Sequence, residues 1–194
     1  IKRWVYIILT LLLVIGNTSV YAIAEQDIPV FEDMPQDWST NALENAIRNG
    51  LLKGSKGRIL PNDNLTRAEM ATIINRSFRA YEEASIEEFK DVPVEVWYYD
   101  EMKKAVQMKT FMGNRGMLNP EEPITREEAF VVVARAFKID DIMRSPWEYS
   151  DLNEVSSWAE KQINGLIYHG YIQGHKNKIN PKGTITRAEF AQLM

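Results

Sequence analysis

The stretch LTRAE at residues 65–69 decides the fold, because it recurs as ITREE at 124–128 and as ITRAE at 185–189. In each copy a threonine is followed three residues later by a glutamate, which is the pattern of a capping box at the start of a helix. We therefore expect helices to begin at Thr66, Thr125 and Thr186. Loss of one of these threonines should cost about 1 kcal/mol of stability.

The sequence around the motif repeats in the same register. A tryptophan precedes each motif threonine by 28 positions, and glycine and proline columns lie between them. Apolar residues in this window recur at helical spacing. The columns are Trp38, Trp97 and Trp158; Leu43, Met102 and Ile163; Ile47, Val106 and Ile167; Leu52, Phe111 and Ile172; Gly54, Gly113 and Gly174; and Pro61, Pro120 and Pro181. The pattern of each unit thus predicts a helix, a turn bounded by glycine, a connector that contains proline, and a second helix.

The second helices have apolar faces of their own, and an aromatic-X-Asp loop opens each unit. We expect these core residues in the first two units: Met70, Ile73, Ile74 and Phe78, then Val132, Val133, Ala136 and Phe137. The loop aspartates are Asp33, Asp91 and Asp151. The period is about 60 residues, and no alternating apolar run indicates a strand. The sequence therefore predicts an all-α repeat protein.

The first residues have the layout of a secretory signal peptide. Lys2 and Arg3 precede an apolar run over residues 5–15, and small residues follow at Ala22 and Ala24. A retained membrane anchor is the alternative, but the run is about half of the roughly 20 residues that a spanning helix needs. We expect membrane contact only through this transient leader at 1–24, followed by repeats at 25–85, 86–145 and 146–194. The third repeat stops inside its second helix, which suggests a piece of a longer, exported protein.

Composition restricts the partners. Without Lys2 and Arg3, 21 basic and 27 acidic residues remain, a net charge of −6 that does not attract nucleic acid. Cysteine is absent, so disulfides and thiolate metal sites are excluded. His169 and His175 match no zinc motif, and residues 62–64 lack the ligand spacing of an EF-hand. We expect no metal and no cofactor.

The acidic residues recur in every unit as loop aspartates and capping glutamates, whereas a catalytic carboxylate pair normally occurs once. We therefore expect no enzymatic activity within these residues.

The capping box explains the threonine and the glutamate of the motif but not the arginine. Arg67, Arg126 and Arg187 fall at the first helical position, where the positive end of the helix dipole disfavours a cation. One account pairs the arginine with a loop aspartate such as Asp33 or Asp91 and locks repeat to repeat. The other places it beside free helix amides, as a site for a carboxylate or a phosphate. The tryptophans also have two interpretations: they hold the helix start to the core, or they stack on a sugar ring.

These residues resemble the S-layer homology family, whose repeat joins an opening aromatic-X-Asp and Trp to a closing Thr-Arg-Ala-Glu. The resemblance implies a pseudo-threefold arrangement in which one helix from each repeat builds a central three-helix bundle. It also implies grooves between repeats that bind secondary cell-wall polysaccharide, commonly through a pyruvylated amino sugar, N-acetylmannosamine. Such binding anchors an exported protein non-covalently to the bacterial envelope. The alternatives are a helical module for protein or lattice assembly, or the anchor of a secreted hydrolase whose catalytic domain lies beyond residue 194.

By this resemblance the ligand-binding positions fall on four columns. They are Arg67, Arg126 and Arg187; Asp33, Asp91 and Asp151; Trp38, Trp97 and Trp158; and Gly50 in GLLKG with Gly170 in GYIQG. The second repeat departs from the family at two positions. It has Lys109 where the others have glycine, and Glu127 where they have Ala68 and Ala188. Lys109 would fill the groove or supply a second cation, and Glu127 would repel an anion beside Arg126.

Overall fold

The computed structural model of the protein describes residues 29–145 and 148–194. Within these ranges it has six α-helices, a short 3-10 helix and isolated bridges, but no strand. The helices are α2 (Thr40–Arg48), α3 (Arg67–Ser77), α4 (Tyr99–Gln107), α5 (Arg126–Phe137), η1 (Leu152–Glu154), α6 (Glu160–Tyr168) and α7 (Arg187–Leu193). The all-α class is confirmed. The expected signal peptide at 1–24 lies outside the described residues, and none of the helices described is long and apolar enough to cross a membrane.

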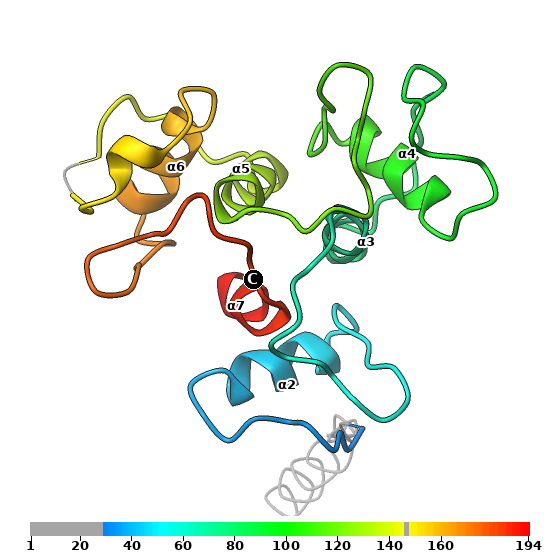
Figure 1. The fold of residues 1–194 in the computed structure, drawn as a ribbon, viewed down its shortest axis with the longest axis horizontal. Coiled ribbons are helices and arrows are strands. Elements are labelled where there is room, and N and C mark those ends of the chain that lie inside the picture. Colours follow the sequence, from blue (N-terminus) through cyan, green and yellow to red (C-terminus); the bar gives the residue numbers. More distant parts are fainter. Residues whose placement is uncertain (1–28, 146–147) are drawn as a thin grey trace, which may run out of the picture.

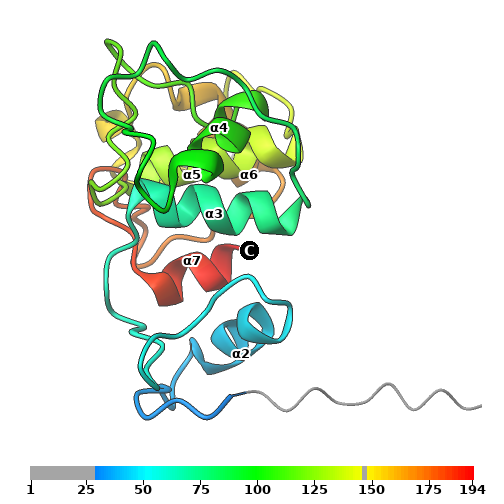
Figure 2. The same cartoon turned by 90° about the vertical axis from the view of Figure 1, so that its right-hand side faces the viewer.

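The second helices of the three repeats, α3, α5 and α7, lie together in the middle of the molecule (Figure 1). The first helix of each repeat lies outside them and packs on the second helix of the repeat before it: α4 on α3, and α6 on α5. The series closes on itself, because α2 of the first repeat packs on α7 of the third. Figure 2 shows α7 between α2 and α3. The repeats therefore form a ring, while an accurate threefold symmetry stays a prediction.

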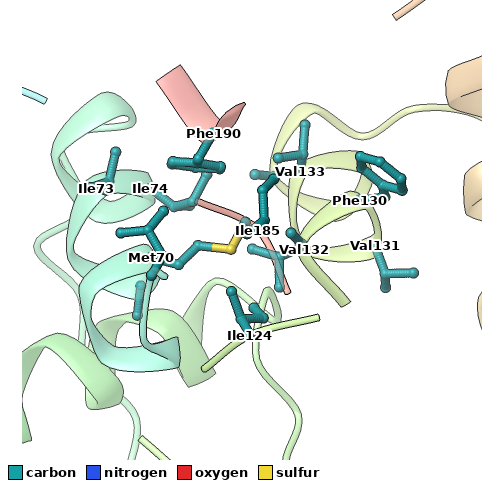
Figure 3. Close-up of a cluster of buried hydrophobic side chains, with 14 of the residues drawn as sticks. Met70, Ile73, Ile74, Ile124, Phe130, Val131, Val132, Val133, Ile185 and Phe190 are labelled. Atoms are coloured by element: carbon teal, nitrogen blue, oxygen red, sulfur yellow. The ribbon is translucent and has the colours of Figure 1, made fainter. Parts of the chain in front are cut away.

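The core fills the space between the three central helices (Figure 3). Met70 and Ile74 of α3, Val132 of α5 and Phe190 of α7 converge there, and each side chain is buried. Helix α5 is apolar on most of its circumference because α3 packs on one side and α6 on another. Helix α5 is thus covered by two neighbours, which explains the continuous apolar run from Phe130 to Ala134.

Two predicted core residues are not in the core. Phe78 and Phe137, at the ends of α3 and α5, are 38% and 49% exposed. Their rings instead pack edge to face, with centroids 5.0 Å apart. Both residues lie at the last turn of their helices, where the two rings cover each other in place of entering the core.

The predicted capping boxes are confirmed in all three motifs. In the first, the Glu69 amide donates to Thr66 Oγ1 over 3.2 Å, and the Thr66 amide donates to Glu69 Oε2 over 2.9 Å. The residue before each threonine joins the repeats. The Leu65 amide donates to the Ile185 carbonyl (3.0 Å), the Ile124 amide to Leu65 (2.9 Å) and the Ile185 amide to Ile124 (3.2 Å). The amides and carbonyls of three buried residues thus close a ring of hydrogen bonds between the repeats.

The glycine column is explained by the aromatic residue of the opening loop. A Cβ at Gly54 would lie 2.0 Å from the Phe31 ring, and one at Gly113 would lie 2.3 Å from Phe89. The aromatic of each aromatic-X-Asp loop therefore packs directly on the glycine of its own repeat. Because any larger residue would displace the ring, the two columns depend on each other.

Candidate ligand-binding interfaces between repeats

The motif arginine of each repeat reaches into the following repeat. Arg67 Nε donates to the Leu118 carbonyl over 2.8 Å, and its Nη1 lies 2.6 Å from Glu128 Oε1. Arg126 repeats this one unit later, with Nε to the Ile179 carbonyl (2.8 Å) and Nη1 to Glu189 Oε1 (2.9 Å). We name these contacts the 1–2 interface and the 2–3 interface.

Arg187 closes the ring by reaching back to the first repeat, which defines the 3–1 interface. Its Nε donates to the Ile59 carbonyl over 2.8 Å and its Nη2 to the Lys53 carbonyl over 2.9 Å. Its Nη1 lies 3.7 Å from Glu69 Oε1, a looser ion pair than the other two. The side chains of Arg67, Arg126 and Arg187 are only 14%, 17% and 11% exposed. All three guanidinium groups are therefore set into the interfaces rather than free on the surface.

Each capping glutamate serves two repeats. In Glu128, Oε2 accepts the amide of its own Thr125 over 2.9 Å, while Oε1 receives Arg67 from the preceding repeat. Glu69 and Glu189 divide their oxygens in the same way. The arginine thus locks repeat to repeat, but its partner is the next capping glutamate and not a loop aspartate. Sequence reasoning had assigned these glutamates to the cap alone.

The loop aspartates hold the turns of their own repeats. Asp33 accepts the amides of Ile59 and Leu60 over 2.7 and 2.9 Å. Asp91 and Asp151 bind the equivalent amides of the second and third repeats. Desolvation raises the pKa of Asp33, but the amides of Ile59 and Leu60 outweigh it and leave the pKa below its ordinary value of 3.8. The three aspartates therefore position the carbonyls that the arginines contact.

The free helix amides that would help to bind an anion are not present at these motifs. The Arg67 amide donates to the Glu122 carbonyl over 3.0 Å and the Ala68 amide to Pro120 over 2.8 Å. The amides of Arg126 and Glu127, and of Arg187 and Ala188, make the same contacts with the next repeat. Together with the capping box, these contacts satisfy the first four amides of each helix. The expectation of a helix N-terminal anion site is therefore wrong.

The three tryptophans are exposed and do not staple their helices to the core. Trp38, Trp97 and Trp158 are 61%, 65% and 51% exposed. The residue after each one is the buried anchor, and these are Ser39, Tyr98 and Ala159. Repeated exposure of so large an apolar ring at one position has no explanation in packing. Stacking of these rings on a sugar stays a prediction.

Gly50, Lys109 and Gly170 share a left-handed backbone, with φ of +68°, +59° and +75°. A Cβ at either glycine would meet nothing within 4 Å, so this side of the turn is open. The side chain of Lys109 is exposed at the same place and makes no hydrogen bond or ion pair with the described part of the chain, although its backbone amide donates to the Val106 carbonyl over 2.9 Å. The lysine therefore extends from an open surface, where it is available as a second cation.

The two departures of the second repeat lie in different interfaces. Lys109 is two residues from Phe111, whose ring lies 5.3 Å from the Arg67 guanidinium, so it belongs with the 1–2 interface. Glu127 bonds Ser156 and Lys182 of the third repeat and belongs to the 2–3 interface. The sequence assigns both departures to the second repeat, but it does not show which neighbouring repeat each of them faces.

The described residues contain no cluster of three or more histidine or acidic side chains that would hold a metal ion. The arrangement instead provides guanidinium groups, an ammonium group and exposed indole rings.

The S-layer homology domain family matches residues 30–71, 88–130 and 148–191 of the chain. The chain is 29% identical over 163 residues to the surface-layer 125 kDa protein of Lysinibacillus sphaericus, covering 79% of this chain and 13% of that protein. It is 32% identical over 173 residues to the cellulosome-anchoring protein of Acetivibrio thermocellus, covering 84% of this chain and 37% of that protein.

An amylopullulanase of Thermoanaerobacterium thermosulfurigenes is 28% identical over 182 residues, which is 91% of this chain and 10% of the enzyme. The chain thus spans only a minor part of each of these relatives. The likeness to a hydrolase concerns the shared repeats and gives no indication of a catalytic domain here.

Proposed function

The chain belongs to the S-layer homology family and is a cell-surface anchoring module, and we propose that it anchors by binding a secondary cell-wall polysaccharide at its inter-repeat interfaces. The ligand would be an anionic sugar polymer, with a pyruvylated N-acetylmannosamine as its recognised unit. This proposal adds a ligand and a place to the anchoring role. No chemical step is involved.

One observation carries the proposal: Trp38, Trp97 and Trp158 are each more than half exposed at the same position of three repeats. Burial of apolar surface stabilises a fold by about 25 cal/mol per Å², and an exposed indole does not make this contribution. A flat aromatic face is the usual partner for the apolar face of a pyranose ring, and polymers of sugars offer that face repeatedly. Three exposed indole rings, one in each repeat, fit a ligand that is a polymer of repeating sugars.

The arginines supply the charge for a carboxylate such as that of a pyruvyl ketal. Arg67 and Arg126 each use Nε and Nη1, and within the described residues their Nη2 groups have no hydrogen-bond partner. Arg187 differs, because its Nη2 already donates to the Lys53 carbonyl. The 1–2 interface therefore offers the best anion site, since Arg67 there has a spare donor and the exposed Lys109 is two residues from Phe111, whose ring lies 5.3 Å from the Arg67 guanidinium.

The test is retention of the chain on purified cell-wall sacculi. Trp97→Ala should reduce retention several-fold and leave the free energy of unfolding within about 0.5 kcal/mol, because the ring is exposed. Tyr81→Ala is the matched control: Tyr81 is 81% exposed but lies outside the repeat columns, so its loss should not change retention.

Acid extraction of the polysaccharide from the sacculi, or genetic removal of its pyruvyl groups, should abolish retention of the wild-type chain. Retention that survives both treatments would instead favour a module for protein or lattice assembly. A loss of retention only after full extraction would keep the polysaccharide and remove the pyruvyl group from the proposal.

A further inference from the structure

The 2–3 interface contains a buried carboxylate that the other two interfaces lack. Glu127, the residue after Arg126, is only 5% exposed. Its counterparts in the first and third repeats are Ala68 and Ala188, both buried. A buried charge is costly unless it is paired and hydrogen-bonded, so its partners decide what it does.

Glu127 is held by a complete set of donors from the third repeat. The Ser156 amide donates to Oε2 over 2.9 Å, and the Ser156 hydroxyl donates to Oε1 over 2.9 Å. The Lys182 ammonium lies 2.7 Å from Oε1 and also donates to Ser156 Oγ over 2.6 Å. An amide, a hydroxyl and an ammonium group converging on two oxygens form a binding site for a carboxylate.

The donors and the carboxylate occur together only here. The residue after the repeat proline is Lys182 in the third repeat, but Asn62 in the first and Glu121 in the second. The residue two before the tryptophan is Ser156 in the third repeat, but Gln36 and Glu95 in the others. The 1–2 and 3–1 interfaces therefore offer no equivalent cation next to the alanine.

We infer that the 2–3 interface contains a binding site for a carboxylate and that the protein's own Glu127 side chain fills it. An anionic ligand is thereby excluded from this site. This inference rests on the proposed function, since it states which interface the ligand does not use. A carboxylate tethered beside its donors acts at a high effective concentration, so a free anion must compete against it. It also places a negative charge in the first turn of α5, beside Arg126. Anionic polysaccharide is thus directed away from the 2–3 interface and chiefly to the 1–2 interface, where the Nη2 group of Arg67 is a spare donor.

The carboxylate site is tested by chemical rescue. Glu127→Ala, which installs the residue of the other repeats, removes the carboxylate that the Ser156 amide, the Ser156 hydroxyl and the Lys182 ammonium contact. The melting temperature of this variant should rise by about 2–4 °C in sodium acetate relative to sodium chloride of equal ionic strength, because acetate fills the site. If the variant is unfolded in chloride, recovery of the helical circular dichroism signal in acetate is the readout.

Glu127→Gln is the matched control, since it keeps the shape of the side chain and leaves no space for acetate. Neither Glu127→Gln nor the wild type should gain stability from acetate. An equal effect of acetate and chloride on Glu127→Ala would overturn the assignment of a carboxylate site.

Exclusion of the ligand is tested by calorimetric titration with the methyl glycoside of pyruvylated N-acetylmannosamine. Glu127→Ala should bind one more molecule per chain than the wild type. Acetate rescue with an unchanged stoichiometry would overturn the exclusion. Acetate rescue with no sugar bound to any form, the wild type included, would contradict the proposed function and leave Glu127 as a structural pair.

Discussion

The motif arginine combines two roles that a sequence reading treats as alternatives. Arg67 is mostly buried, bonds a carbonyl and a carboxylate of the next repeat, and still has one guanidinium nitrogen without a partner in the described structure. A planar group with five donors can tie two repeats together and bind an anion on its remaining edge. Interface stability and ligand binding are therefore coupled at this residue.

We predict that Arg67→Ala lowers the free energy of unfolding by about 1.5–3 kcal/mol, because two charge-assisted hydrogen bonds are lost and Glu128 loses its cationic partner. Arg58→Ala is the control: Arg58 is 57% exposed and 3.5 Å from Asp33, so its loss should cost less than about 1 kcal/mol. Urea unfolding measures both. If both variants lose an equally small free energy of unfolding, the ion pair of the 1–2 interface does not stabilise the fold, and ligand binding is the remaining role of Arg67.

Asp33 should make the first repeat sensitive to acid. The amides of Ile59 and Leu60 lower the pKa of Asp33 in the folded state. The carboxylate therefore stabilises the fold in full when the pH is above the pKa of Asp33 in the unfolded chain. That contribution is lost as the pH falls through the folded-state pKa, which lies below 3.8. Asp33→Asn should therefore lose less stability than the wild type between about pH 6 and about pH 3. Urea unfolding at the two pH values checks this, with Asp100→Asn, 69% exposed, as the control. Identical pH dependence of all three forms would contradict it.

At the scale of the helix, the capping box is local and separable from the contact between repeats. Thr66→Ala should cost about 1 kcal/mol, while Thr66→Ser keeps the hydroxyl and should cost less. Glu69→Ala should cost more than Thr66→Ala, because Glu69 also receives Arg187. Thermal unfolding followed by circular dichroism gives the order. If Glu69→Ala costs no more than Thr66→Ala, the 3.7 Å pair with Arg187 contributes nothing.

The elements that the sequence predicted well are those set by contacts a few residues apart. The helix starts at Thr66, Thr125 and Thr186 follow from a side chain and an amide three positions away, so the pattern contains the whole interaction. The arginine partners do not follow in this way. Glu128 is 61 residues from Arg67, and only the ring arrangement of the repeats makes them neighbours.

Exposure was the other quantity that spacing could not predict. Trp97 and Tyr98 are adjacent at the start of a helix, and their side chains point in different directions. Tyr98 is buried and Trp97 is exposed, but the sequence does not show which of the two enters the core. Which one is buried depends on how α4 meets α3, and that contact is long-range. For the same reason, helical periodicity placed Phe78 on the right face of α3 but could not show that the face ends uncovered.

At the scale of the whole molecule, closure distinguishes this fold from a linear array of repeats. In a solenoid each repeat contacts only its neighbours in sequence, and stability is nearly a sum over repeats. Here α2 packs on α7, and the three motif backbones share one cycle of hydrogen bonds. Removal of any repeat breaks two of the three interfaces and leaves two buried backbone groups without partners.

We therefore predict that a chain ending at residue 145 does not unfold cooperatively, although it keeps two complete repeats. It would expose the faces of α5 and α2 that α6 and α7 cover, and it would lose the contacts of Leu65 and Ile124 with Ile185. A urea titration followed by circular dichroism should show a shallow change in place of a sigmoidal transition. Addition of residues 146–194 as a separate peptide should restore the transition, because the contacts of α2 with α7, of α5 with α6, and of Leu65 and Ile124 with Ile185 are all non-covalent. A sharp transition of the two-repeat chain alone, with a midpoint near that of the parent, would show that the repeats are additive and that closure adds no cooperativity.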